Sequence, residues 1–167
     1  MTVTATDPEA VAQATCDDLV TRMAPLRDIV RPPADAPPHE VYGVLVDVRA
    51  RLDLAETLLT ESQRFRIGSR SRAAMRKGEA DDAYTEAMAK LAQQAVRRQY
   101  EGVEDRRAQA NFQTLPLRRK ARTAQRVADI ADDCYERVRT LYFSLRDLRQ
   151  ELLDSLRYLE WESHLER

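Results

Sequence analysis

The fold is decided by residues 130–159, which read IADDCYERVRTLYFSLRDLRQELLDSLRYL. Apolar residues recur there at intervals of three and four positions: Ile130, Cys134, Val138, Leu141, Leu145, Leu148, Leu152, Leu156 and Leu159. This spacing places them along one side of an α-helix, as in coiled coils and helical bundles. Tyr142, Phe143 and Trp161 lie off that line. The apolar surface is therefore wider than a two-stranded seam, which favours a bundle or a larger oligomer.

The helix that carries this seam is predicted to be long. Thr114 fits an N-cap with Pro116 in the first turn, and no glycine or proline follows Pro116. Two or three partner helices in a chain of 167 residues cannot bury so long an apolar side, so we expect self-association. The predicted oligomer interface consists of Val138, Leu141, Leu145, Leu148, Leu152, Leu156 and Leu159.

A first helix is predicted to begin behind Asp7, an N-cap that is followed by Pro8 at the first helical position. Its apolar side includes Val11, Leu19, Val20 and Met23, and Pro25 is expected to kink or end it. Residues 31–38, RPPADAPP, are typical of a stiff, extended linker. This linker is expected to separate the N-terminal element from the rest of the chain.

A second helix is predicted to begin near Pro38, and its apolar residues are Val41, Leu45, Val48, Leu52, Ala55 and Leu59. The pattern fades where Ser62 and Arg66 occupy the next positions, so the helix either ends at Gly68 or continues as a polar, basic rod. Residues 78–84, GEADDAY, are interpreted as a break and the start of a third helix that runs to about residue 100. A connector is expected around Gly102 and residues 111–113.

These elements predict an all-α fold, in which long helices with coiled-coil-like seams form a helical hairpin or bundle. Nothing in the chain alternates with a period of two, as a half-buried strand would. We divide the chain into an N-terminal helical element over residues 1–31, a proline-rich linker over 32–38 and the hairpin or bundle over 39–167.

Charge is nearly balanced overall but unevenly distributed along the chain. Residues 1–48 hold 3 basic and 8 acidic side chains, residues 49–127 hold 18 and 10, and residues 128–167 hold 6 and 10. The middle of the chain is therefore basic between two acidic ends. Such a segregated pattern indicates a surface for an anionic partner.

Two stretches without any acid contain most of this basic charge, RFRIGSRSRAAMRKG at residues 64–78 and LRRKARTAQR at residues 117–126. Basic side chains that neutralise phosphates release counterions, which gives a salt-dependent affinity for nucleic acid. Phe65, Tyr100 and Phe112 lie close to these stretches and could stack on unpaired bases. The predicted nucleic-acid-binding residues are Arg64, Arg66, Arg70, Arg72, Arg76, Lys77, Arg118, Arg119, Lys120 and Arg122. The alternative for the same residues is internal or intersubunit pairing with acidic residues of this protein, for example those of its acidic ends in a neighbouring subunit.

We expect no enzyme activity, no cofactor and no metal site. The sequence contains no glycine-rich phosphate loop and no serine nucleophile elbow, and its two histidines lack metal-ligand spacing. Asp129, Asp132, Asp133 and Glu136 cluster on the last helix, where a solvated or arginine-paired face is expected rather than metal binding.

We expect a soluble, cytoplasmic protein with no membrane partner. The N-terminus has neither the basic nor the apolar region of a signal peptide, and no run is apolar enough to span a membrane. Cys16 and Cys134 share no motif and suit a reducing compartment, but the sequence does not decide whether a disulfide joins them.

Three features of residues 45–162 occur in a fixed order: a helix that runs into a basic stretch (residues 49–78), the pattern AYTEAMAKL at residues 83–91, and a long last helix that closes with RYLEWE at residues 157–162. In this layout the chain resembles the UvsY-like phage recombination-mediator family. Residues 1–38 lie outside it, and arginine stands where lysine is common in that family. The resemblance implies an oligomer that loads a recombinase onto single-stranded DNA, in a bacterial host cytoplasm if a phage encodes it.

Two functions of different classes follow from these observations. The first is a non-enzymatic accessory protein that binds single-stranded nucleic acid, with a recombinase as a further partner. The second is a structural or adaptor protein, for example a phage assembly component, whose arginines pair with a protein. Salt-dependent binding of DNA distinguishes them, because only the first predicts it.

Overall fold

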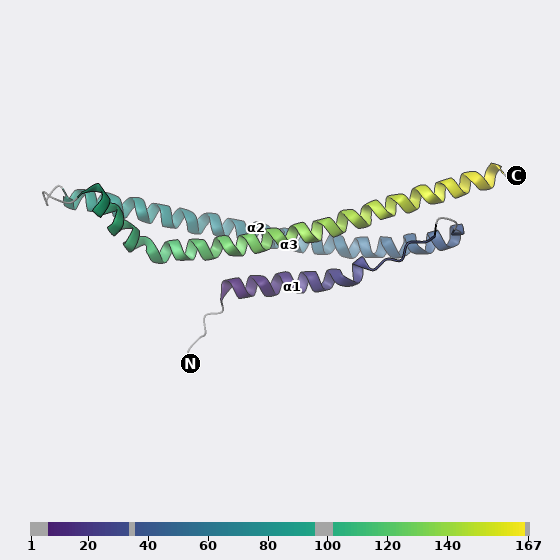
Figure 1. Cartoon of the computed structure of the whole chain (residues 1–167), viewed down its shortest axis with the longest axis horizontal. Helices are drawn as coiled ribbons and strands as arrows, with labels where there is room; N and C mark the ends of the chain where they lie inside the picture. Colours follow the sequence, from purple (N-terminus) through teal and green to yellow (C-terminus); the bar gives the residue numbers. More distant parts are fainter. Residues whose placement is uncertain (1–6, 34–35, 96–101, 166–167) are drawn as a thin grey trace, which may run out of the picture. The chain divides into compact units, whose positions relative to one another are not determined.

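The computed structural model describes residues 7–33, 36–95 and 102–165. They form three helices, α1 (Pro8–Arg27), α2 (Pro38–Ala95) and α3 (Val103–Leu165), shown in Figure 1. These ranges contain no strand, and apolar clusters lie between the helices. The predicted all-α fold is therefore confirmed for the part of the chain that the structure describes.

The predicted start of α1 is confirmed. The Glu9 backbone nitrogen donates to Asp7 Oδ1 at 3.0 Å, so Asp7 satisfies one of the free N–H groups of the first turn. Pro25 lies inside the helix, which ends two residues later at Arg27. A proline near the end of a helix removes one backbone hydrogen bond there, so little of the helix remains beyond it.

The predicted break at residues 78–84 is wrong, because α2 continues without interruption from Pro38 to Ala95. Neither Gly68 nor Gly78 has a positive φ, and both are interior residues of the helix. Each glycine costs about 1 kcal/mol of helix stability relative to alanine. Flanking alanine, arginine, methionine and glutamate residues favour the helix enough to offset that cost.

The predicted cap at Thr114 and the connector at residues 111–113 are also wrong. Both lie inside α3, and the Thr114 hydroxyl donates to the Ala110 carbonyl oxygen at 2.8 Å instead of capping a helix start. Figure 1 shows that the green first part of α3 is bent. Pro116 and the Thr114 hydroxyl account for a bend here, since each disturbs the backbone hydrogen bonds of its turn.

The chain divides into two compact units, which we describe separately. Unit 1 comprises Met1–Gln13 and Arg66–Ala131, and unit 2 comprises Ala14–Phe65 and Asp132–Arg167. Each unit takes residues from all three helices. The segments 1–31, 32–38 and 39–167 that the sequence indicated therefore do not coincide with the units of the structure.

The seam of α3 forms the core of unit 2. Val138 is fully buried and Leu145 is 3% exposed, while Leu148 and Leu152 form one cluster with residues of α2 and the linker. Leu156 and Leu159 are half-buried against the same cluster. The single chain thus buries Val138, Leu141, Leu145, Leu148 and Leu152 and covers Leu156 and Leu159 in part, so the burial of the first five does not require a second copy. Self-association stays a prediction.

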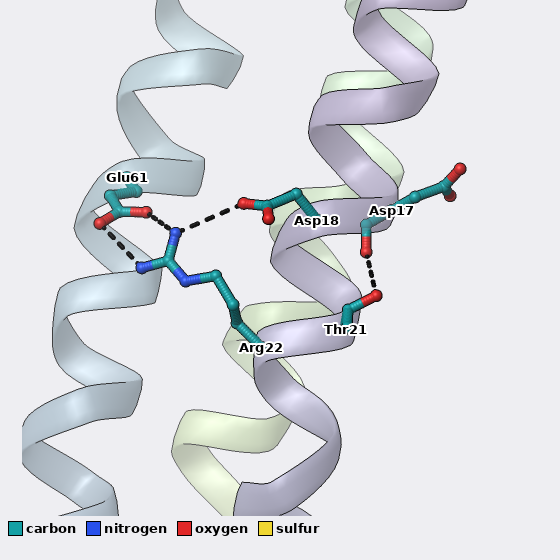
Figure 2. Close-up of polar contacts among 5 residues, drawn as sticks. All are labelled: Asp17, Asp18, Thr21, Arg22 and Glu61. Carbon is teal, nitrogen blue, oxygen red and sulfur yellow. Dashed lines mark hydrogen bonds and ion pairs between the residues drawn. The ribbon is translucent and has the colours of Figure 1, made fainter.

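The linker does not separate α1 from the other helices of unit 2. Arg22 of α1 donates to both carboxylate oxygens of Glu61 of α2, at 2.6 and 3.1 Å, as Figure 2 shows. Arg51 Nη1 of α2 donates to the carbonyl oxygen of Pro25 at 2.6 Å. Within the linker, Ala36 is only 3% exposed and belongs to the core. The N-terminal element is therefore packed onto the bundle, which corrects the sequence prediction.

Small residues form the buried side of unit 1. On α2 these are Ser69, Ala73, Ala80 and Ala87, joined by the larger Leu91, and on α3 they are Ala110, Thr114, Ala128 and Ala131. The three-and-four spacing of α2 therefore continues past Leu59, because Ser62 is also fully buried. The sequence suggested that the seam fades at Ser62, but the buried repeat continues beyond it. Serine and alanine replace the large apolar residues of the seam there, and they allow close helix packing.

Candidate nucleic-acid interface

Nine of the ten predicted binding residues lie in unit 1, and Arg64 lies in unit 2. Successive residues of a helix are rotated by about 100° around its axis, so the basic residues of α2 lie at different angles from its buried side. Arg66, Arg70 and Lys77 lie on one flank of that side, and Arg72 and Arg76 lie on the other. The stretch at residues 64–78 is therefore not one continuous basic face.

Several basic side chains of α2 are engaged within the chain. Arg76 pairs with Glu79 at 2.7 Å, and Arg72 Nη2 lies 3.5 Å from Ser69 Oγ. The hydrogen bond from Arg22 and, to a smaller extent, the charge of Arg64 lower the pKa of the Glu61 carboxyl, and Arg66 and Arg70 also have partners. Lys77 is exposed and forms no ion pair with any residue of the described ranges. Fewer basic side chains of residues 64–78 are therefore available to bind an anion than the charge of this stretch suggests.

One side of α3 in unit 1 combines exposed basic and apolar side chains. Phe112 is 78% exposed and Leu115 is 38% exposed, although both are large apolar residues. Arg119 and Arg122 follow at intervals of four and three, are exposed, and have no ion-pair partner among the residues that the structure describes. We name Phe112, Leu115, Arg119, Arg122 and Arg126 the α3 outer face, because their spacing places them opposite the buried alanines.

Two arginines near this face have partners in unit 1. Arg126 Nη1 lies 3.3 Å from Glu9 Oε1, so the acidic first turn of α1 contacts the face. Arg118 Nη1 donates to Asn111 Oδ1 at 2.6 Å, and its guanidinium carbon lies 4.7 Å from the centre of the Tyr84 ring. Arg118 is thus held against α2. Lys120 is exposed but lies beside the face rather than on it.

Of the three aromatic residues that the sequence indicated for base stacking, Phe112 has the required exposure. Phe65 is half-buried, and Tyr100 lies outside the described residues. Arg126 was not among the ten predicted residues. Extending the three-and-four repeat of α3 through its buried alanine and threonine residues would have placed Arg126 on one face with Arg119 and Arg122.

The acidic cluster of α3 pairs with neighbouring arginines. Arg137 Nη2 lies 2.5 Å from Asp133, and Arg139 lies 3.2 Å from Glu136. Asp129 accepts a hydrogen bond from Gln125 Nε2 at 2.8 Å. Arginine pairing is therefore confirmed for Asp133 and Glu136. Within the described ranges, no three histidine, cysteine or acidic side chains are arranged to hold a metal ion.

None of the described helices has the combination of length and apolar character that a membrane span requires. Comparisons of the chain with protein-family models, with curated proteins and with solved structures find no match.

Proposed function

We propose that this protein is a non-enzymatic accessory protein that binds single-stranded nucleic acid through the α3 outer face. The observation that supports the proposal is the exposure of Phe112, at 78%, on the same side of the helix as Arg119 and Arg122. An exposed phenyl ring offers a stacking surface to an unpaired base, worth about 1–3 kcal/mol per base. The adjacent guanidinium groups suit phosphate oxygens, which they contact with paired N–H groups.

A single strand fits this face better than a duplex does. The bases of a duplex are stacked on one another, so Phe112 has no open base to contact there, whereas an unpaired base presents its ring. Phosphate contacts alone would support either form of nucleic acid. The resemblance to recombination mediators extends the proposal to the delivery of the bound strand to a recombinase.

A helical adaptor with an acidic protein partner is the second candidate function. The Glu9–Arg126 pair at 3.3 Å favours it, because a carboxylate already occupies one arginine of the α3 outer face. In that function the face would bind acidic side chains of another protein, and nucleic acid would not bind in a salt-dependent manner.

The proposal is tested by titrating the chain against a labelled oligothymidylate and a matched duplex at two salt concentrations. Replacing Arg119→Glu together with Arg122→Glu should weaken single-strand binding by on the order of ten- to a hundredfold and reduce its salt dependence. Phe112→Ala should weaken binding of the single strand and leave the duplex unaffected.

The matched control is Arg139→Glu with Arg157→Glu, which makes the same change in charge on unit 2. Both arginines pair there with neighbouring acids, Glu136 and Asp154. Equal loss of binding in the control would show a general effect of charge. Unchanged binding in the Arg119/Arg122 variant would refute the proposed site, and absence of salt-dependent binding would favour the adaptor.

A further inference from the structure

A groove of about 330 Å³ lies between α2 and α3 in unit 2. Three arginines line it, Arg49 on α2 and Arg146 and Arg149 on α3, together with Asp53, Glu56 and Tyr142. Sites for small molecules begin at about 300 Å³, so the groove is large enough for one. It shares no residue with the α3 outer face, which belongs to unit 1, so the proposed function does not account for it.

The contacts of α1 lie on the other side of unit 2 from this groove. Helix α1 contacts α2 through Arg51 and Glu61. Counted from the buried Val48 at about 100° per residue, both lie on one flank of α2. Arg49 and Asp53 lie on the other flank and are exposed. On α3, the residues beside the end of α1 and those of the groove likewise lie on opposite flanks of the buried leucines. The groove is therefore open to a ligand.

The two arginines of α3 that line the groove have no acidic partner on their own helix. Arg137, Arg139 and Arg157 each pair with an acid three or four residues away. No acid occupies those positions relative to Arg146 or Arg149, and neither forms an ion pair with any residue of the described ranges. Like charges three residues apart on a helix repel each other. An anion bound between them would relieve that repulsion.

Arg49 adds a third unpaired guanidinium from the opposite wall. Asp53 follows it by four positions, but a basic residue that precedes an acid is the weaker order for such a pair, and no ion pair joins the two. Arg146 lies 6.0 Å from the centre of the Phe143 ring, a contact that leaves its N–H groups free to donate. Three guanidinium groups from two helices can therefore donate to one anion in the groove.

We propose that this groove binds a nucleoside diphosphate. Guanidinium groups hold phosphate oxygens with paired N–H groups, and two phosphates suit arginines on both walls. The half-buried ring of Tyr142 offers a surface on which a base can stack. Asp53 and Glu56 would repel a simple anion, but carboxylates accept hydrogen bonds from ribose hydroxyl groups. A ligand that carries both phosphates and hydroxyl groups therefore accounts for both kinds of charge in the groove.

The test is isothermal titration of the full chain with ADP in the absence of divalent metal ions, with pyrophosphate and adenosine as partial ligands. One ADP should bind per chain, more tightly than either partial ligand. Arg146→Gln together with Arg149→Gln should weaken ADP binding by on the order of ten- to a hundredfold, because charge-assisted hydrogen bonds are lost. Circular dichroism checks that each variant keeps its helices.

Two further variants locate the site and separate the roles of its walls. Arg139→Gln with Arg157→Gln is the matched control, since these arginines also lie on α3 in unit 2 but do not line the groove, and it should leave ADP binding unchanged. Asp53→Ala with Glu56→Ala should weaken binding of ADP, which has ribose hydroxyl groups. The same change should leave pyrophosphate binding unchanged or stronger, because pyrophosphate only experiences the repulsion of the carboxylates.

Four outcomes would overturn the proposal. The chain does not bind ADP at millimolar concentration, or the matched control loses binding as the Arg146/Arg149 variant does. Pyrophosphate binds as tightly as ADP, so that the groove recognises phosphate alone. ADP binding is lost on replacing Arg119→Glu with Arg122→Glu, which would place the nucleotide on the α3 outer face instead. Since ADP titration does not depend on binding of a nucleic-acid strand, this proposal and the proposed function fail independently.

Discussion

Glu9 Oε1 of α1 lies 3.3 Å from Arg126 Nη1 of α3, which places an acidic side chain on the α3 outer face. The Arg126 side chain is 69% exposed and that of Glu9 is 31% exposed. A carboxylate in this position competes with a phosphate for the same guanidinium. The proposed binding site therefore includes an internal competitor within unit 1.

Replacing Glu9→Gln should increase the affinity for a single-stranded oligonucleotide. An exposed ion pair is worth about 0.2–1 kcal/mol, so the gain is expected to be at most about fivefold and to shrink with added salt. Fluorescence anisotropy at two salt concentrations measures it. Glu136→Gln, which frees Arg139 in unit 2, is the matched control, and an equal gain in both variants would contradict a local effect.

Replacing Arg118→Ala should lower stability more than it lowers binding. The guanidinium lies over the Tyr84 ring and donates to Asn111, so its loss should cost about 0.5–2 kcal/mol of the free energy of unfolding. Arg119→Ala should show the opposite pattern, weaker binding with unchanged stability. Thermal unfolding and fluorescence anisotropy of the two variants check this. The reverse result would indicate that Arg118, which lies against α2, binds nucleic acid and that Arg119 does not.

Replacing Gly68→Ala or Gly78→Ala should stabilise the chain by about 0.5–1 kcal/mol each. Both positions are interior to α2, neither has a positive φ, and a Cβ at either would meet no atom within 4 Å apart from the nearby backbone of its own helix. Urea unfolding monitored by circular dichroism gives the change. Gly102→Ala, outside the helices, should give no comparable gain. Destabilisation by Gly78→Ala would instead indicate that the chain turns there, as its sequence suggested.

Sequence reasoning succeeded where large apolar side chains or a strong local cap determine the structure. Leu145, Leu148 and Leu152 were predicted to lie on one side of a helix, and all three are buried. Asp7 was predicted to cap α1 and does so. For the leucine residues, the local sequence pattern and the tertiary packing favour the same side of the helix. For Asp7, the cap is formed by a hydrogen bond within the first turn, so it does not depend on distant residues.

Sequence reasoning failed where the same residue type suits two environments. Thr114 has the chemistry of an N-cap, yet its hydroxyl donates to a carbonyl oxygen inside α3. Serine is polar, so the sequence predicts that the seam fades at Ser62, yet this residue is fully buried in unit 2. On α3 the outward side is set by a buried repeat of alanine and threonine, so charge alone could not place Arg119, Arg122 and Arg126 on one face.

Replacing Ser62→Leu should destabilise the chain by about 1–3 kcal/mol, because a fully buried position sized for serine would be overpacked. The Ser62 hydroxyl donates to the Leu59 carbonyl oxygen at 2.9 Å, a group that already accepts a backbone bond in a helix. Ser62→Ala should therefore be nearly neutral. Urea unfolding of the two variants distinguishes a buried seam from an exposed one, since an exposed Ser62 would tolerate leucine.

The Arg22–Glu61 pair should contribute to the dependence of stability on pH. The hydrogen bond from Arg22 lowers the pKa of the Glu61 carboxyl below its ordinary value of 4.5. A carboxyl whose pKa is lowered by folding stabilises the protein above the pKa of the unfolded chain, and this contribution is lost as the pH falls through the lower, folded value. Both side chains are more than a third exposed, so solvent screening limits the contribution to at most about 1 kcal/mol.

Replacing Glu61→Gln should therefore reduce the free energy of unfolding at pH 7 and leave it nearly unchanged at a pH well below 4.5, where the native carboxyl has also lost its charge. Urea unfolding of both proteins across that range gives the difference as a function of pH. Glu151→Gln removes another pair in unit 2, at 3.2 Å between more exposed side chains, and should show a smaller change. A Glu61 effect that is equal at every pH would mean that the carboxylate acts through packing rather than through its charge.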